Sequence, residues 1–391
     1  MSVCRCLVTL TAGLLGATSL LAGVLPEDRA DTLYHYYDGG GVQIDGPSIL
    51  VRKNIKDTVS VYGNYYVDSI SSASIDVVTS GASQYSEERN EYSVGMDFLH
   101  EDTLMSVSFT DSAENDYKAQ SLNFGVSQEV FGGLTTVTMG YGQGSDKVFR
   151  NGPDGKPDGI FSDKADRRNY RLGISQVVTR NMLLGLDYEA ITDEGFLNNP
   201  YRQVRYEDPD SAIGYSYQPE IYPRTRSSNA VSINTRYYLP YRAALYGGYR
   251  FFTDSWGIDA HNVNIGYTHP MADSWVFDLS YRFYTQSSAD FYSDLFPYEN
   301  AQNFLARDKE LSTFTSHTIR FGASYNLLSE GWGFLEKATL NFYIDHIFYD
   351  YRNFRDLRPV DENGAPLFAP GEEPAYTYSA DVLQLYFSVW F

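Results

Sequence analysis

An acidic, glycine-rich segment, NGPDGKPDGIFSDKAD, contains the residue types that could bind a metal ion. Asp154, Asp158, Asp163 and Asp166 lie among glycines there, and closely spaced carboxylates are ligands that Ca²⁺ prefers. The spacing does not fit the EF-hand loop, so a solvated acidic loop is the favoured interpretation and we expect no resident cofactor. Asp154, Asp158 and Asp163 stay as candidate Ca²⁺ ligands.

The histidines include one motif that could support catalysis. In GIDAH, Asp259 and His261 form an Asp-x-His pair, a combination that hydrolases use together with a serine. An isolated pair is a weak signal, so we expect the protein not to be an enzyme. His317 and His346 fall on otherwise apolar faces, which predicts positions at a rim or at a β-bulge. The other histidines are His35, His100 and His269.

The composition argues against nucleic acid as a partner. Asp and Glu number 50 against 30 Lys and Arg, a formal net charge of -20, whereas phosphate binding needs basic patches. The sequence contains 34 Tyr and 23 Phe. Tyrosine suits positions where one end of the ring is wet and the other apolar. The composition therefore indicates a boundary between water and an apolar phase.

The first 23 residues have the features of a secretory signal peptide. Arg5 precedes the apolar run CLVTLTAGLLGATSLLAGV, which ends in the small residues Ala22 and Gly23. A transmembrane anchor is the alternative, and a lipoprotein would need cysteine where Val24 stands. We expect residues 1–23 to be cleaved and residues 24–391 to form one domain. The two cysteines lie in the leader, so the mature chain would have neither a disulfide nor a thiolate metal site.

The rest of the chain alternates between apolar and polar residues with a period of two. In WVFDLSYRFY, Trp275, Phe277 and Leu279 share one face, and Asp278 and Ser280 share the other. Such segments are often longer than the strands of about five to six residues that are usual in soluble proteins. They predict long β-strands with one apolar face.

The connections between these strands alternate in length. Short turns such as HEDT and VTRN alternate with long polar segments, a pattern typical of outer-membrane barrels. The long segments are Ser69–Glu87, Gly144–Asp166, Asp193–Arg226, Ser287–Ser312 and Tyr351–Tyr376.

We therefore predict an all-β fold, a transmembrane antiparallel up-and-down β-barrel in the bacterial outer membrane. It would have short periplasmic turns and long extracellular loops. We expect about 16 strands, with 14–18 allowed, a size class that leaves an aqueous channel. The first strand would lie near Thr32–Tyr37 and the last at Val382–Phe391.

If the apolar faces contact lipid, the opposite faces line a lumen. The charged residues predicted there are Arg52, Asp97, Arg171, Asp187, Glu189, Arg236, Arg250, Asp278, Arg282, Arg320 and Asp345. They could set an electric field across a water-filled pore, or pair across strands to satisfy one another. Both interpretations can hold together.

Several blocks of sequence resemble a family of Gram-negative outer-membrane proteins, domain of unknown function 3570. They span Pro26–Lys53, Tyr65–Ser93, Asp193–Tyr206, Tyr217–Ala230 and Phe291–Thr318. The resemblance implies the barrel and the compartment but no substrate or catalytic residue. Members encoded near envelope redox proteins imply an accessory or conduit role.

These observations leave three functional hypotheses. The leading one is a porin-like channel for small hydrophilic solutes. The alternative is a barrel that acts as scaffold or conduit for an envelope system, including a redox system, and the third is a rim-sited enzyme. The expected partners are outer-membrane lipid and lipopolysaccharide, the barrel assembly machinery and envelope proteins, with no nucleic acid.

The last strand predicts a role in assembly. Its apolar face ends on a terminal aromatic residue and consists of Leu383, Leu385, Phe387, Val389 and Phe391. This pattern resembles the signal read by the outer-membrane assembly machinery.

Deleting Phe391 should therefore lower the yield of folded barrel in outer-membrane fractions, measured as the heat-modifiable band on gels. The physical reason is the loss of the aromatic end of the recognised strand. An unchanged yield, compared with wild type expressed at the same level, would contradict the assembly-signal interpretation.

Overall fold

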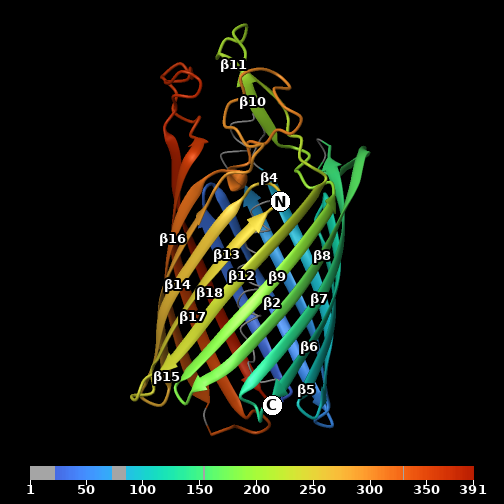
Figure 1. Ribbon diagram of the computed structural model, residues 1–391, viewed down its shortest axis with the longest axis vertical. Coiled ribbons are helices and arrows are strands. Elements are labelled where there is room, and N and C mark those ends of the chain that lie inside the picture. Colours follow the sequence, from blue (N-terminus) through green and yellow to red (C-terminus); the bar gives the residue numbers. More distant parts are fainter. Residues whose placement is uncertain (1–22, 73–84, 153–154, 329) are drawn as a thin grey trace.

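The computed structural model describes residues 23–72, 85–152, 155–328 and 330–391, whose strands close into an antiparallel barrel (Figure 1). The barrel strands are β1 (Arg29–Gly39), β2 (Val42–Ile55), β3 (Val59–Ser72), β4 (Tyr85–His100), β5 (Thr103–Ala113), β6 (Tyr117–Val130), β7 (Thr135–Asn151), β8 (Pro157–Thr179), β9 (Met182–Gly195), β12 (Thr225–Tyr238), β13 (Ala244–Asp254), β14 (Asp259–Met271), β15 (Trp275–Gln286), β16 (Phe314–Leu328), β17 (Lys337–Arg355) and β18 (Ala375–Trp390). Outside the barrel, β10 (Gln203–Glu207) pairs with β11 (Tyr215–Pro219), and the 3₁₀ helix η1 spans Lys309–Leu311.

The first and last strands close the sheet. β1 pairs with β2 on one side and with β18 on the other, in a register that runs from Arg29 opposite Trp390 to Gly39 opposite Ala380. The sixteen strands of this ring confirm the predicted fold class and strand number. No helix in the described part of the chain has the length and apolar character needed to cross a membrane.

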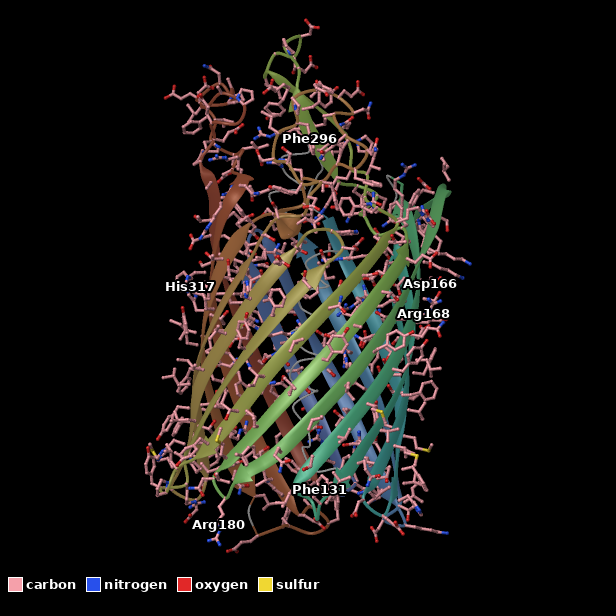
Figure 2. All side chains as sticks on the ribbon, in the orientation of Figure 1. Phe131, Asp166, Arg168, Arg180, Phe296 and His317 are labelled. Carbon is pink, nitrogen blue, oxygen red and sulfur yellow. The ribbon has the colours of Figure 1, made fainter. Side chains whose placement is uncertain are left out.

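The two ends of the barrel differ in their connections. Phe131 and Arg180, labelled at the bottom of Figure 2, lie in short turns, and the carboxyl terminus lies at the same end in Figure 1. At this turn end, Lys56 and Asp57 both have positive φ, as a tight hairpin between right-twisted strands requires. The opposite end, called the loop end below, carries the long connections, and its opening is called the mouth.

The strands extend further toward the loop end than the sequence predicts. The segment Gly144–Asp166 was expected to be a loop, but β7 continues to Asn151 and β8 begins at Pro157. Likewise β18 begins at Ala375 rather than at Val382. On β18, Tyr376, Ala380 and Val382 are buried on the inner face, so near the mouth the apolar face of a strand no longer marks its outer side. The alternation expected of a lipid-facing strand therefore ends before the strand pairing does. Residues 1–22 of the leader lie outside the described residues.

Alternate side chains lie on opposite faces of the wall. On β18, Leu385 and Phe387 are exposed on the outer face, whereas Gln384 and Ser388 are buried on the inner face. Exposed apolar residues cover the outside of the other strands in the same way, for example Phe124 on β6 and Leu279 on β15. This belt is the surface expected of a barrel immersed in lipid.

A charge on the outer face of β6 should damage folding, and the same charge on the inner face should not. Phe124 lies on the outer face, and its neighbour Asn123 is also exposed but faces the lumen, opposite Ser108 and Gly142. Phe124→Arg should destabilise the barrel by about 2–4 kcal/mol because arginine is costly at the membrane midplane. Asn123→Arg is the matched control and should stay close to wild type. Unfolding of both variants in lipid vesicles would measure this, and equal losses would overturn the assignment of faces.

Candidate functional site

The inner wall of the barrel carries ion pairs that join neighbouring strands. Arg320 donates two hydrogen bonds of 2.6 Å to the buried carboxylate of Asp345 on β17. Arg52 on β2 pairs with Asp97 on β4 and donates to Ser60 at 3.0 Å. These four predicted lumen residues therefore satisfy one another, as the pairing interpretation requires.

A second network leaves its arginines open to the lumen. Glu189 on β9 accepts a 3.1 Å hydrogen bond from Arg171 on β8 and a 2.6 Å hydrogen bond from Arg250 on β13. The side chain of Arg171 is 67% exposed and that of Arg250 is 42% exposed, although both lie on the inner face. Two cations thus flank one anion where side chains leave space for water.

Tyrosines lie flat on the inner wall because the residue beneath each of them is glycine. Tyr62 lies over Gly95, and a Cβ at Gly95 would come within 2.3 Å of the ring. The same arrangement pairs Tyr246 with Gly266 and Tyr343 with Gly322, at 2.1 and 2.6 Å. The arginines Arg52, Arg236 and Arg320 lie over these rings at 4.5, 5.8 and 5.7 Å from the centroids. Each arginine stacks on a ring that keeps close to the wall.

The remaining predicted lumen residues form no ion pair within the described part of the chain. Asp278 accepts hydrogen bonds from Tyr246 at 2.9 Å and from Thr268 at 2.7 Å. Asp187 accepts weaker hydrogen bonds from β12, and within the described residues Arg282 Nε has no hydrogen-bond partner. The structure therefore distributes the predicted charges between ion pairs, stacked rings and polar contacts rather than into one cluster.

Sequence reasoning missed a buried polar network near the mouth. His35 on β1 hydrogen-bonds Asp68 on β3 at 2.7 Å and stacks on Tyr66 with 4.9 Å between centroids. Arg89 on β4 pairs with the other oxygen of Asp68 at 2.5 Å. The alternation of apolar and polar residues could predict that these side chains face inward. Their contact with one another could not be predicted, because it depends on the register of three strands.

The long loops fold together into a cap over the C-terminal half of the mouth. The cap comprises residues 196–224, 287–313 and 356–374, and Figure 1 shows β10 and β11 standing above the rim. Backbone hydrogen bonds join its first two segments, from Phe296 to the Arg205 carbonyl at 2.9 Å and from Leu305 to the Ile221 carbonyl at 2.7 Å. Val204, Phe296 and Leu305 form a small buried core within the cap. Figure 2 shows Phe296 in this raised position.

Arg205 on β10 lies at the centre of the cap. Its side chain is 0% exposed and pairs with Asp294 from the second cap segment and with Glu373 from the third. Burial favours the neutral guanidine, but the hydrogen bonds and charges of Glu373 and Asp294 outweigh that effect and raise the pKa of Arg205. Arg307 also pairs with Asp294 at 3.1 Å, so two guanidiniums balance two carboxylates.

One edge of the cap packs against the inside of the barrel. The amide of Gln286, buried at the end of β15, donates 2.8 Å hydrogen bonds to the carbonyls of Glu310 and Ser312. These residues belong to η1 and its C-cap, and Asp308 at the N-cap pairs with Arg202. The second cap segment therefore folds over the inner wall and narrows the mouth on that side.

The candidate calcium and catalytic residues have other partners. Asp158 accepts hydrogen bonds from Arg150 at 2.8 Å, and Asp163 from Arg224 at 2.9 and 3.0 Å. Asp154 lies outside the described residues, and the structure does not bring Asp158 and Asp163 to a common ligand. His261 bonds the Tyr249 hydroxyl at 2.8 Å on the outer face. His317 and His346 also lie on the outer face, against Tyr281 and Asp381.

A family profile matches residues 7–334 of the sequence and carries the description "Protein of unknown function (DUF3570)". The chain belongs to this family. The match confirms the family resemblance noted in the sequence blocks. No curated protein matched the sequence.

Solved structures share the architecture at low sequence identity. A bacterial polysaccharide outer membrane secretin matches with a TM-score of 0.50 and 6% identity over 94% of this chain and 100% of that chain. OmpT of Vibrio cholerae matches with a TM-score of 0.43 and 10% identity, over 94% of this chain and 100% of that chain. The CymD monoaromatic hydrocarbon channel matches with a TM-score of 0.44 and 8% identity, over 94% of this chain and 89% of that chain. At this identity the secretin match shows the fold alone, that of an outer-membrane-type barrel.

Removing the central arginine should loosen the cap and leave the barrel intact. Arg205→Met leaves the buried carboxylate of Glu373 without its arginine and leaves Asp294 with Arg307 alone. Breaking a buried ion pair costs about 3–5 kcal/mol. Thermolysin should then cut the cap about a hundredfold faster or more, because cleavage follows local opening. Arg224→Met is the matched control, since the pair of Arg224 with Asp163 is exposed. Equal cleavage rates in the two variants, with both barrels heat-modifiable, would contradict the central role of Arg205.

Proposed function

We propose that the protein is an outer-membrane channel through which small hydrophilic solutes diffuse. In this proposal the turn end faces the periplasm, the cap faces the cell exterior, and the outer belt contacts lipid and lipopolysaccharide. The observation that carries the proposal is the exposure of Arg171 and Arg250 on the inner face. Charged side chains facing inward and still exposed imply water inside the barrel.

The lumen chemistry favours polar solutes without strong preference for one charge. The wall carries both acids and bases, and most of them are paired, as with Arg320 and Asp345. The Arg171–Glu189–Arg250 network is the exception because it places two cations beside one anion. This network would give the channel a mild preference for anions.

The cap would control access rather than bind the solute. The second cap segment packs on the inner wall through Gln286. Buried ion pairs such as Arg205 with Glu373 hold the three cap segments together. A solute would enter beside the cap. The cap also favours a second candidate function, a scaffold, because an ordered outer surface can dock an envelope partner.

Replacing Arg171 and Arg250 on the inner face should change the ion selectivity of the channel. Arg171→Gln combined with Arg250→Gln leaves Glu189 without its cations, so the cation-to-anion permeability ratio should rise about twofold or more. The measurement is the reversal potential across a salt gradient in planar bilayers. Arg168→Gln is the matched control, because Arg168 lies on the outer side of the same strand in Figure 2.

The results separate the two candidate functions. A shift in the double variant alone supports the channel and its arginine network. Wild-type protein that shows no conductance over many insertions would refute the channel and favour the scaffold. Conductance that ignores the double substitution would keep the channel and discard these arginines as its filter.

A further inference from the structure

A group of three carboxylates lies across the mouth from the cap's anchor on β15. Glu87 is near the loop end of β4, and Glu114 and Asp116 lie at the turn between β5 and β6. One carboxylate oxygen from each residue lies within 4.8 Å of the others. None of the three belongs to the ion pairs of the lumen described above, so the group requires its own explanation.

The barrel fixes the positions of these side chains. Glu87 has the inward parity of Asp97 on the same strand, whereas the adjacent Glu88 faces outward and is exposed. The turn is held by hydrogen bonds from the Glu114 amide to the Tyr117 carbonyl and from the Phe149 amide to the Asp116 carbonyl, both 2.7 Å. The carboxylates therefore converge because strand pairing places them together.

Asp116 is the most constrained member of the group. The residue is 2% exposed, and its Oδ1 has no hydrogen-bond donor within the described part of the chain. Tyr201 of the cap lies beside Asp116, and its hydroxyl accepts a hydrogen bond from the Asn151 amide at 2.6 Å. A buried carboxylate oxygen without a donor is costly, and two further carboxylates beside it add repulsion.

A bound cation would remove both costs. Two oxygen ligands on opposite sides of a Ca²⁺ ion lie about 4.6–5.2 Å apart, given Ca–O distances of about 2.3–2.6 Å. The observed upper limit of 4.8 Å is compatible with a shared ion. The donor set consists of hard carboxylate oxygens, which suits Ca²⁺, and it lacks the nitrogen or sulfur ligands typical of zinc.

We propose that Glu87, Glu114 and Asp116 bind one Ca²⁺ ion at the loop end of the barrel. The remaining coordination positions would be filled by water, as is common for this ion. Through the contact between Asp116 and Tyr201, the ion would also hold the first cap segment against the N-terminal side of the mouth. This proposal does not depend on the channel function.

Calorimetric titration of the folded mature barrel in detergent, after treatment with chelator, tests the proposal. Wild type should bind one Ca²⁺ per chain. Glu114→Gln combined with Asp116→Asn should lower the affinity at least about tenfold, because calcium affinity depends on the number of charged ligands. Titration with Mg²⁺ should show weaker binding, since Mg²⁺ demands tighter octahedral geometry.

The matched control is Glu88→Gln, which removes a carboxylate from the outer face of the same strand and should keep wild-type affinity. If the double variant gives no heat-modifiable barrel, the single variant Glu114→Gln is titrated by the same criteria. A wild type without a saturable Ca²⁺ site overturns the proposal. A folded Glu114 variant that retains wild-type affinity overturns it equally.

Discussion

Backbone hydrogen bonds between β1 and β18 close the sheet, and the other features of the protein depend on this closure. In a lipid environment an unpaired strand edge would leave amides and carbonyls without partners, so the ring must be complete. Once the ring is closed, parity alone assigns each side chain to lipid or to lumen. Charged residues such as Asp345 and Glu189 can then lie on the inner face, where the wall of a barrel in lipid would separate them from the apolar phase.

The barrel and the cap are stabilised by different interactions. The barrel depends on continuous strand pairing, whereas the cap has one short two-stranded sheet, β10 with β11, and a few isolated β-bridges, and relies on buried side chains. Its centre is a charge-balanced group of Arg205, Arg307, Asp294 and Glu373 drawn from all three cap segments. The cap can therefore open locally without disturbing the barrel strands below it. The stability of the cap is in this way independent of the stability of the barrel.

The fold was predictable because its signal is local. A segment such as WVFDLSYRFY predicts both a strand and its two faces within ten residues. A barrel in lipid must then close, because an open strand edge would leave backbone groups unpaired. The ends of strands were harder to place. Between Gly144 and Asp166 the larger apolar residues come as the adjacent pairs Val148–Phe149 and Ile160–Phe161, so the paired strands β7 and β8 show no alternation to detect.

The site was only partly predictable, because its contacts join distant parts of the chain. The inward facing of Arg250 followed from alternation, but its partner Glu189 is 61 residues away. The role of Arg205 could not be read at all, since it lies in a segment without periodicity and its partners are 89 and 168 residues away. Asp163 suggested calcium in isolation, but it lies on β8 and Arg224 of the cap pairs with it.

The tyrosines that lie on glycines have a consequence for how the strands find their alignment. A slip of one residue would expose charges to lipid, but a slip of two keeps every side chain on its proper face. Alternation alone therefore permits such an error. The positions two residues from Gly95 are Ser93 and Asp97, and those flanking Gly266 are Asn264 and Thr268. A slipped Tyr62 or Tyr246 would meet a side chain in place of an empty recess, so each ring seated on glycine favours one alignment of its hairpin during assembly.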